Sequence, residues 1–169
     1  MTLIVCGLAD VETLVAARRP SHMITLLDPV TLGSIPDFAV GRRLRLGLND
    51  VNEPMEGMIP PDEASVAEIL AFGRGWDERE PMLIHCWAGI SRSTATAFVL
   101  ACEKSPEADE TEIALALRRA APHALPNRRI VGYADRLLGR DGRMLEALEA
   151  MGDYDAAQAQ PFDFPARHA

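Results

Sequence analysis

Residues 82–93 of the chain read MLIHCWAGISRS. The apolar run from Met82 to His85 predicts a short buried strand. The small and apolar residues that follow, 93–102, predict a buried helix, because that segment is apolar nearly all round. Cys86 therefore stands at the carboxyl end of a strand, and Arg92 opens a helix. A loop of five residues with a single glycine connects the two.

The rest of the chain predicts further strands and helices of the same kind. Apolar or alternating runs predict strands at Thr2–Cys6, Met23–Leu27 and Arg43–Leu48. Apolar residues at helical spacing predict helices near 11–15, 62–73, 113–120, 130–138 and 144–148. Strands that alternate with helices pair in parallel, so the expected fold class is α/β, with a central mostly parallel sheet flanked by helices. Such sheets bind ligands beyond the carboxyl ends of their strands.

Two segments are expected to lie outside this regular pattern. Residues 31–41 contain Gly and Pro and predict a loop. From Gly152 the chain is rich in Ala, Gln, Pro and Asp. We therefore expect one domain over residues 1–151 and a poorly ordered tail over 152–169.

Composition narrows the classes of partner. The 169 residues are 48% hydrophobic and 25% charged, and the formal net charge is −8, so nucleic acid and anionic membranes are unexpected partners. No apolar run approaches the ~20 residues of a membrane span, and we expect no signal peptide. Three widely spaced cysteines fit a reducing cytoplasm, and their spacing is not typical of a zinc site. Cys6 and Cys102 are expected to be core residues.

The loop after Cys86 has the features of an anion site. Successive backbone N–H groups ahead of a helix form a nest for an anion, and Gly89 permits a backbone conformation that a Cβ would resist. Arg92 can hold two phosphate oxygens with its planar guanidinium. The same positive surroundings should stabilise a Cys86 thiolate as a nucleophile, and Ser93 can donate a hydrogen bond to that sulfur.

The pattern His85-Cys86-x5-Arg92-Ser93 resembles the signature of the cysteine-dependent protein tyrosine phosphatases, in particular the compact dual-specificity type. The resemblance implies Cys86 as nucleophile, Arg92 as phosphate clamp, Ser93 as an aid to thiolate departure and His85 as a brace of the loop. The phosphate cradle would be Trp87, Ala88, Gly89, Ile90, Ser91 and Arg92. Trp87 departs from the family pattern, where a smaller or polar residue is usual. The resemblance implies no metal and no cofactor.

A leaving tyrosine oxygen needs a proton, so a carboxylic acid should face the loop. Asp77 is excluded, because it precedes the strand that ends at Cys86 and an extended strand rises ~3.3 Å per residue. Asp50, at the carboxyl end of another strand, resembles the acid of the compact enzymes, and Asp28, Glu53 and Glu56 are its competitors. The long loop 49–61 is expected to act as a partial lid.

The apolar contacts of that lid would be Met55, Met58 and Ile59. Asn127 resembles the asparagine that buttresses the phosphate loop in the compact family, and it is equally well explained as a helix cap.

The expected activity is hydrolysis of phosphate monoesters on protein side chains, with phosphotyrosine favoured and a cysteinyl-phosphate intermediate. The partners are then a phosphorylated protein or peptide and the product, inorganic phosphate. The alternatives are a rhodanese-like sulfurtransferase and a catalytically inactive phosphate-binding module. A lipid phosphatase is disfavoured, because residues 87–91 contain no lysine for additional phosphates.

Overall fold

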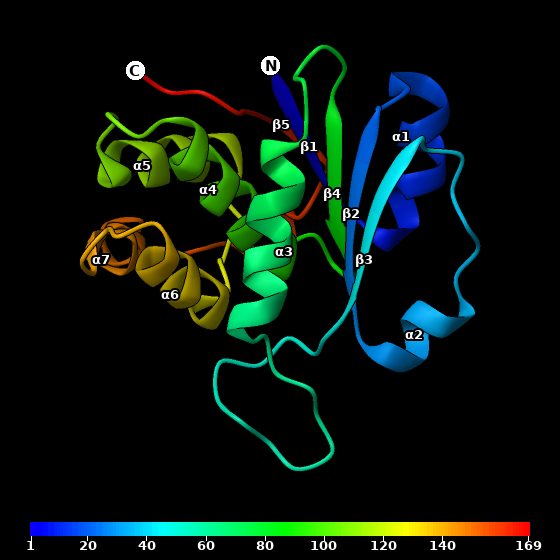
Figure 1. Cartoon of the computed structure of the whole chain (residues 1–169), viewed down its shortest axis with the longest axis horizontal. Coiled ribbons are helices and arrows are strands. Elements are labelled where there is room, and N and C mark those ends of the chain that lie inside the picture. The colour runs from blue at the N-terminus through cyan, green and yellow to red at the C-terminus, as the bar shows by residue number, and fades with distance from the viewer.

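The computed structural model describes residues 1–169 and has a five-stranded sheet at its centre (Figure 1). The strands are β1 (Thr2–Gly7), β2 (His22–Leu27), β3 (Arg42–Gly47), β4 (Met82–Cys86) and β5 (Phe162–Pro165). Their order in the sheet is β3-β2-β4-β1-β5. β1 to β4 are parallel and β5 is antiparallel to β1, so the predicted α/β fold with a mostly parallel sheet is confirmed.

Helices cover the two faces of the sheet unequally. They are α1 (Val11–Arg18), α2 (Pro29–Ser34), α3 (Glu63–Arg74), α4 (Arg92–Lys104), α5 (Glu110–Ala120), α6 (Arg128–Leu137) and α7 (Arg143–Ala150), with short 3-10 helices η1 (Leu8–Asp10) and η2 (Ala156–Gln158). Figure 1 shows α3 to α7 on one side of the sheet and α1 on the other. The core of 35 buried residues lies on the α3–α7 side, against six on the α1 side. The stability of the fold therefore rests mainly on the first of these layers.

α4 lies within the larger core, in contact with β4, β1, α3, α5 and α6. Its residues from Arg92 to Cys102 are all buried, which confirms the predicted buried helix. None of the helices combines the length and the apolar character that crossing a lipid bilayer requires.

The C-terminal segment, residues 152–169, differs from the predicted poorly ordered tail. Phe162–Pro165 forms the edge strand β5 against β1, and Phe164 is buried in the main core. The guanidinium of Arg167 donates two hydrogen bonds, of 2.8 and 2.9 Å, to the carboxylate of Glu78. The signal in the sequence was weak, because the alternation of apolar residues covers only Phe162 and Phe164 and prolines flank it.

Part of the predicted loop 31–41 is also helical. α2 begins after Asp28, whose Oδ1 accepts a 2.9 Å hydrogen bond from the backbone N–H of Thr31. Pro29 occupies the first turn, where its missing N–H costs nothing. The sequence predicted a loop here because Gly33 has a low helix propensity and Pro36 follows shortly after.

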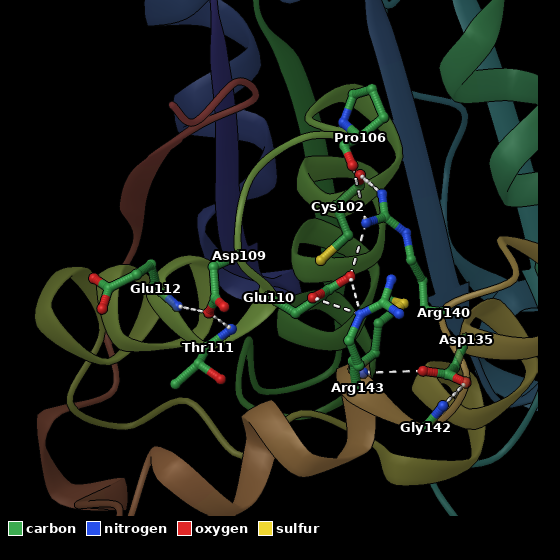
Figure 2. A network of polar contacts seen from close by, with 11 residues as sticks. Cys102, Pro106, Asp109, Glu110, Thr111, Glu112, Asp135, Arg140, Gly142 and Arg143 are labelled. Atoms are coloured by element: carbon green, nitrogen blue, oxygen red, sulfur yellow. Dashed lines mark hydrogen bonds and ion pairs between the residues drawn. The ribbon is translucent and has the colours of Figure 1, made fainter.

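A buried ion pair joins the helices on the α3–α7 side (Figure 2). Arg140 Nη1 lies 2.7 Å from Glu110 Oε1, and both side chains are less than a tenth exposed. Arg140 also donates to the carbonyl of Cys102 at 2.8 Å. Arg143 reaches the other carboxylate oxygen of Glu110 at 3.2 Å, but its side chain is half exposed. The carboxylate of Glu110 is thus the only negative charge that neutralises buried Arg140.

Glu110→Gln is expected to lower the free energy of unfolding by about 3 kcal/mol, because it leaves the Arg140 charge buried without its counter-ion. Arg143→Ala is the matched control, since it removes a solvent-exposed partner of the same carboxylate and should cost less than about 1 kcal/mol. Denaturant unfolding of both variants measures the difference. Equal losses in the two variants would show that the buried pair contributes no more than the exposed one.

Candidate active site

The loop after Cys86 connects the end of β4 to the start of α4. Gly89 within it has φ +73°, and a Cβ there would lie 2.7 Å from the backbone nitrogen of Gly7. Leu8 donates its backbone N–H to the carbonyl of Trp87 at 3.0 Å. The loop therefore packs directly on the end of β1, and the predicted need for glycine at position 89 is confirmed.

The start of α4, where the loop ends, favours an anion. Ser91, the residue before α4, makes no side-chain capping hydrogen bond to the first amides of the helix. These N–H groups and the positive end of the helix dipole therefore remain available to a ligand. Cys86 lies beside them, buried, with its Sγ 3.2 Å from the Oγ of Ser93.

Arg92 is buried beneath the same loop. Its Nη1 donates to the carbonyl of Leu48 at 2.8 Å, whereas its Nε is buried and has no hydrogen-bond partner. Buried N–H groups without a partner are rare in folded proteins. An oxyanion in the loop would supply an acceptor for this guanidinium.

The carboxylate of Asp50 is held against the loop by two donors. The Oγ of Ser91 donates to Asp50 Oδ1 at 2.7 Å, and the Nδ2 of Asn127 donates to the same oxygen at 2.9 Å. Asn127 also caps α6, since its Oδ1 accepts from the N–H groups of Arg129 and Ile130. The helix-cap explanation is therefore confirmed. The side chain of Asn127 contacts Asp50 and not the loop after Cys86, which Asn127 reaches only with its backbone N–H, at the carbonyl of Ser91 (3.2 Å).

His85 links the loop to the middle of the sheet. Its Nε2 lies 2.8 Å from the Oγ1 of Thr25 on β2, and its Nδ1 lies 3.4 Å from the carbonyl oxygen of Cys86. The ring is fully buried, and this burial lowers the pKa of His85 to about 4. The imidazole is therefore neutral at physiological pH.

This depressed pKa makes stability depend on pH. An unfolded histidine has a pKa near 6.5, so between about pH 6.5 and pH 4 the unfolded state binds a proton that the folded state does not. His85 should thus contribute about 3 kcal/mol above pH 6.5 that is lost progressively as the pH falls towards 4. His85→Gln should flatten the plot of unfolding free energy against pH by this amount. Parallel plots for the two proteins would contradict a depressed pKa.

A pocket of about 360 Å³ opens above Cys86. It is lined by Asp50, Asn52, Cys86, Trp87, Ala88, Ile90, Ser91, Arg92, Leu125, Tyr154 and Ala156. The pocket thus brings together the cysteine, the arginine and the aspartate that the sequence places in one site. The lining does not include four other residues of the predicted site: His85, Gly89, Ser93 and Asn127.

Four of the lining residues were not predicted from the sequence. Asn52 lies two residues after Asp50, in the loop 49–61. Leu125 precedes α6 without any motif of its own, and Tyr154 and Ala156 belong to the C-terminal segment. Tyr154 is the single aromatic residue in a run of polar and small residues. Contacts between distant parts of the chain hold this segment near Cys86, among them the pairing of β5 with β1.

The three competitors of Asp50, which are Asp28, Glu53 and Glu56, do not line the pocket above Cys86. Asp28 caps α2, and Glu53 lines a neighbouring hollow of about 480 Å³ formed largely by α6. The long loop after β3 is present, but Met55, Met58 and Ile59 are exposed and none of them lines the pocket above Cys86. The expected apolar contacts of a lid are therefore not made.

All three cysteines are free thiols. Cys6 and Cys102 are buried, as expected, and Cys6 on β1 pairs in register with His85 on β4. Burial, with the nearby negative charges of Asp10 and Cys86, raises the pKa of Cys6 to about 12. Burial also raises the pKa of Cys102. Of the three, only Cys86 lines the pocket.

No protein-family model and no curated protein matches the sequence. Solved structures do match. The structure of DUSP15 is 18% identical and aligns with a TM-score of 0.62 over 88% of this chain and 89% of that chain. The Yvh1 phosphatase domain from Chaetomium thermophilum is 18% identical and aligns with a TM-score of 0.63 over 84% of this chain and 93% of that chain. The structure of PTPMT1 in complex with PI(5)P is 14% identical and aligns with a TM-score of 0.60 over 82% of this chain and 94% of that chain.

At 14–18% identity these likenesses establish the architecture and not the activity. They span most of the chain and most of each neighbour, so they concern the whole domain. The chain has the fold of the dual-specificity members of the cysteine-dependent phosphatases.

Proposed function

We propose that the protein hydrolyses phosphate monoesters on protein side chains, phosphotyrosine above all, through a cysteinyl-phosphate intermediate on Cys86. The observation that carries the proposal is the position of Cys86 beneath an anion site. Buried Arg92, with an unpartnered Nε, and the uncapped amides at the start of α4 surround the same pocket. A phosphate bound there would present its phosphorus to the Cys86 sulfur.

In the first step the Cys86 thiolate attacks phosphorus, and the bond from phosphorus to the ester oxygen breaks. Asp50 gives its proton to the departing oxygen, so the alcohol or phenol leaves neutral. Both hydrogen bonds to Asp50 fall on Oδ1, which leaves Oδ2 free to carry that proton. Arg92 and the loop N–H groups stabilise the charge on the transferring phosphoryl group.

In the second step a water molecule attacks the phosphorus of the cysteinyl phosphate. Asp50, now a carboxylate, takes a proton from that water, and the bond between sulfur and phosphorus breaks. The Oγ of Ser93 can donate a hydrogen bond to the thiolate as it leaves, across the 3.2 Å that separates the two atoms. The cycle consumes one water and releases inorganic phosphate, and Arg92 and the loop N–H groups supply its positive field without a metal.

Two other activities share parts of this site. A rhodanese-like sulfurtransferase also uses a loop cysteine, but it has no use for a carboxylate positioned as Asp50 is. An inactive phosphate-binding module would need the loop without the nucleophile, and Cys86, Arg92 and Ser93 are all present. The PTPMT1 structure contains a phosphoinositide, but residues 87–91 of this chain contain no lysine for additional phosphates.

The test is phosphate release from a phosphotyrosine peptide, with a phosphoinositide and thiosulfate plus cyanide as the competing substrates. We expect turnover of the peptide in the presence of a chelator, and inhibition by vanadate and by thiol alkylation. Acid quenching during turnover should trap phosphate on Cys86, detectable by mass spectrometry. Sulfur transfer without phosphate release, or a strict need for an added divalent ion, would overturn the proposal.

A further inference from the structure

One wall of the pocket above Cys86 comes from the C-terminal segment. Tyr154 and Ala156 line it together with residues of the loop such as Trp87. Sequence motifs place the phosphate site in residues 85–93 alone. The pocket is therefore completed by a part of the chain that lies about 60 residues further on.

The segment is fixed on both sides of Tyr154. Before it, Arg118 donates its Nε to the carbonyl of Met151 at 3.2 Å. Immediately after it, the backbone N–H of Asp155 donates to the carbonyl of Pro122 at 2.9 Å. Further on, β5 pairs with β1 as the edge of the sheet. The backbone on both sides of Tyr154 is thus held in place by hydrogen bonds, without any bound ligand.

Both aromatic rings at the pocket are free of other aromatic contacts. Trp87 is 60% and Tyr154 is 47% exposed, although both line the pocket. Neither takes part in the aromatic pairs or the cation–π contacts of the chain, which involve other residues. Exposed aromatic faces at the rim of a pocket can receive the ring of a ligand.

We propose that Trp87 and Tyr154 form an aromatic clamp that binds the phenyl ring of an aryl phosphate and so selects phosphotyrosine over phosphoserine. The proposal rests on the phosphatase function given above. A phosphate held between Arg92 and the loop places the next group of the substrate at the rim. In phosphotyrosine that group is a flat ring, which both side chains can contact. In phosphoserine it is a single methylene, which reaches neither ring face.

Binding to the Cys86→Ser variant tests the clamp without turnover. Titration calorimetry would compare inorganic phosphate with one peptide that carries either phosphotyrosine or phosphoserine. Adding Tyr154→Ala should weaken the phosphotyrosine peptide about 3- to 10-fold, the range that loss of an aromatic contact gives. It should leave the affinities for inorganic phosphate and for the phosphoserine peptide unchanged. Tyr154→Phe should retain the affinity, since the ring and not the hydroxyl is used.

The control variant is Leu137→Ala, which removes an exposed apolar side chain that does not line the pocket. It should leave all three affinities unchanged. In the active enzyme, Tyr154→Ala should raise KM for the phosphotyrosine peptide while kcat stays close to wild type.

Several results would overturn the clamp alone. Unchanged phosphotyrosine affinity in Tyr154→Ala shows that the ring makes no contact. An equal loss for all three ligands shows that Tyr154 only supports the loop, and tighter binding of all three shows that it obstructs the pocket. The proposed function fails in a different way. In that case the Cys86→Ser protein, with Tyr154 intact, binds none of the three ligands, and the clamp is overturned with it.

Discussion

Cys86→Ser is expected to abolish the hydrolysis of aryl phosphates, with a fall in kcat of about 10⁴-fold or more. A serine hydroxyl in the same place is not ionised at neutral pH, so it cannot attack phosphorus as the thiolate does. The substitution leaves Arg92 and the uncapped amides of α4 in place. Phosphate and vanadate should therefore still bind, and calorimetry beside a steady-state assay separates lost chemistry from lost binding.

Cys102→Ala is the matched control, because it removes a buried thiol from the same helix layer without touching the pocket. It should keep turnover within a few-fold of wild type at a temperature where both proteins are folded. Near wild-type activity in Cys86→Ser would show that another group attacks phosphorus. Loss of phosphate binding in that variant would contradict the anion site beside Cys86 and, with it, the proposed function.

The part of the site formed by β4, the loop after Cys86 and the start of α4 was predictable from the sequence. A buried strand, a glycine loop and a buried helix are each defined by local composition, and their order places Cys86 and Arg92 at one end of the sheet. Asp50 follows from the same rule, because it lies just beyond the carboxyl end of β3, another parallel strand of the sheet. The TM-scores of 0.60 to 0.63 with solved phosphatase structures confirm that this local reasoning gave the correct fold.

Other features depend on contacts that no local pattern encodes. β5 is four residues long and joins the sheet because the edge of β1 is open and Phe164 can enter the core. The bond from Ser91 to Asp50 joins residues 41 positions apart, and Tyr154 reaches the pocket only through the path of the C-terminal segment. Long-range contacts of this kind complete the lining of the pocket, so the sequence predicted the cysteine loop better than the residues that surround it.

Asp50→Asn should slow the first chemical step by about 10²–10⁴-fold for phosphotyrosine or phenyl phosphate. Tyrosine is a poor leaving group, since its phenol has a pKa near 10 and its expulsion without a proton is costly at neutral pH. A nitrophenyl ester leaves readily as its anion, so the same variant should slow that substrate much less. Asparagine keeps an acceptor for the hydrogen bonds from Ser91 and Asn127, so the side chain should stay in place. The substitution removes only the acidic proton and the negative charge.

Single-turnover measurements are the appropriate readout, because Asp50 also activates water in the second step and steady-state rates mix the two roles. Glu53→Gln is the control, since Glu53 follows Asp50 in the same loop but lines the neighbouring hollow. It should leave the rates on both esters unchanged. An equal loss in Asp50→Asn on every leaving group would mean that Asp50 positions Ser91 and the loop without donating a proton. If Glu53→Gln showed the dependence on the leaving group instead, the acid would be Glu53, brought to the pocket by a movement of the loop after β3.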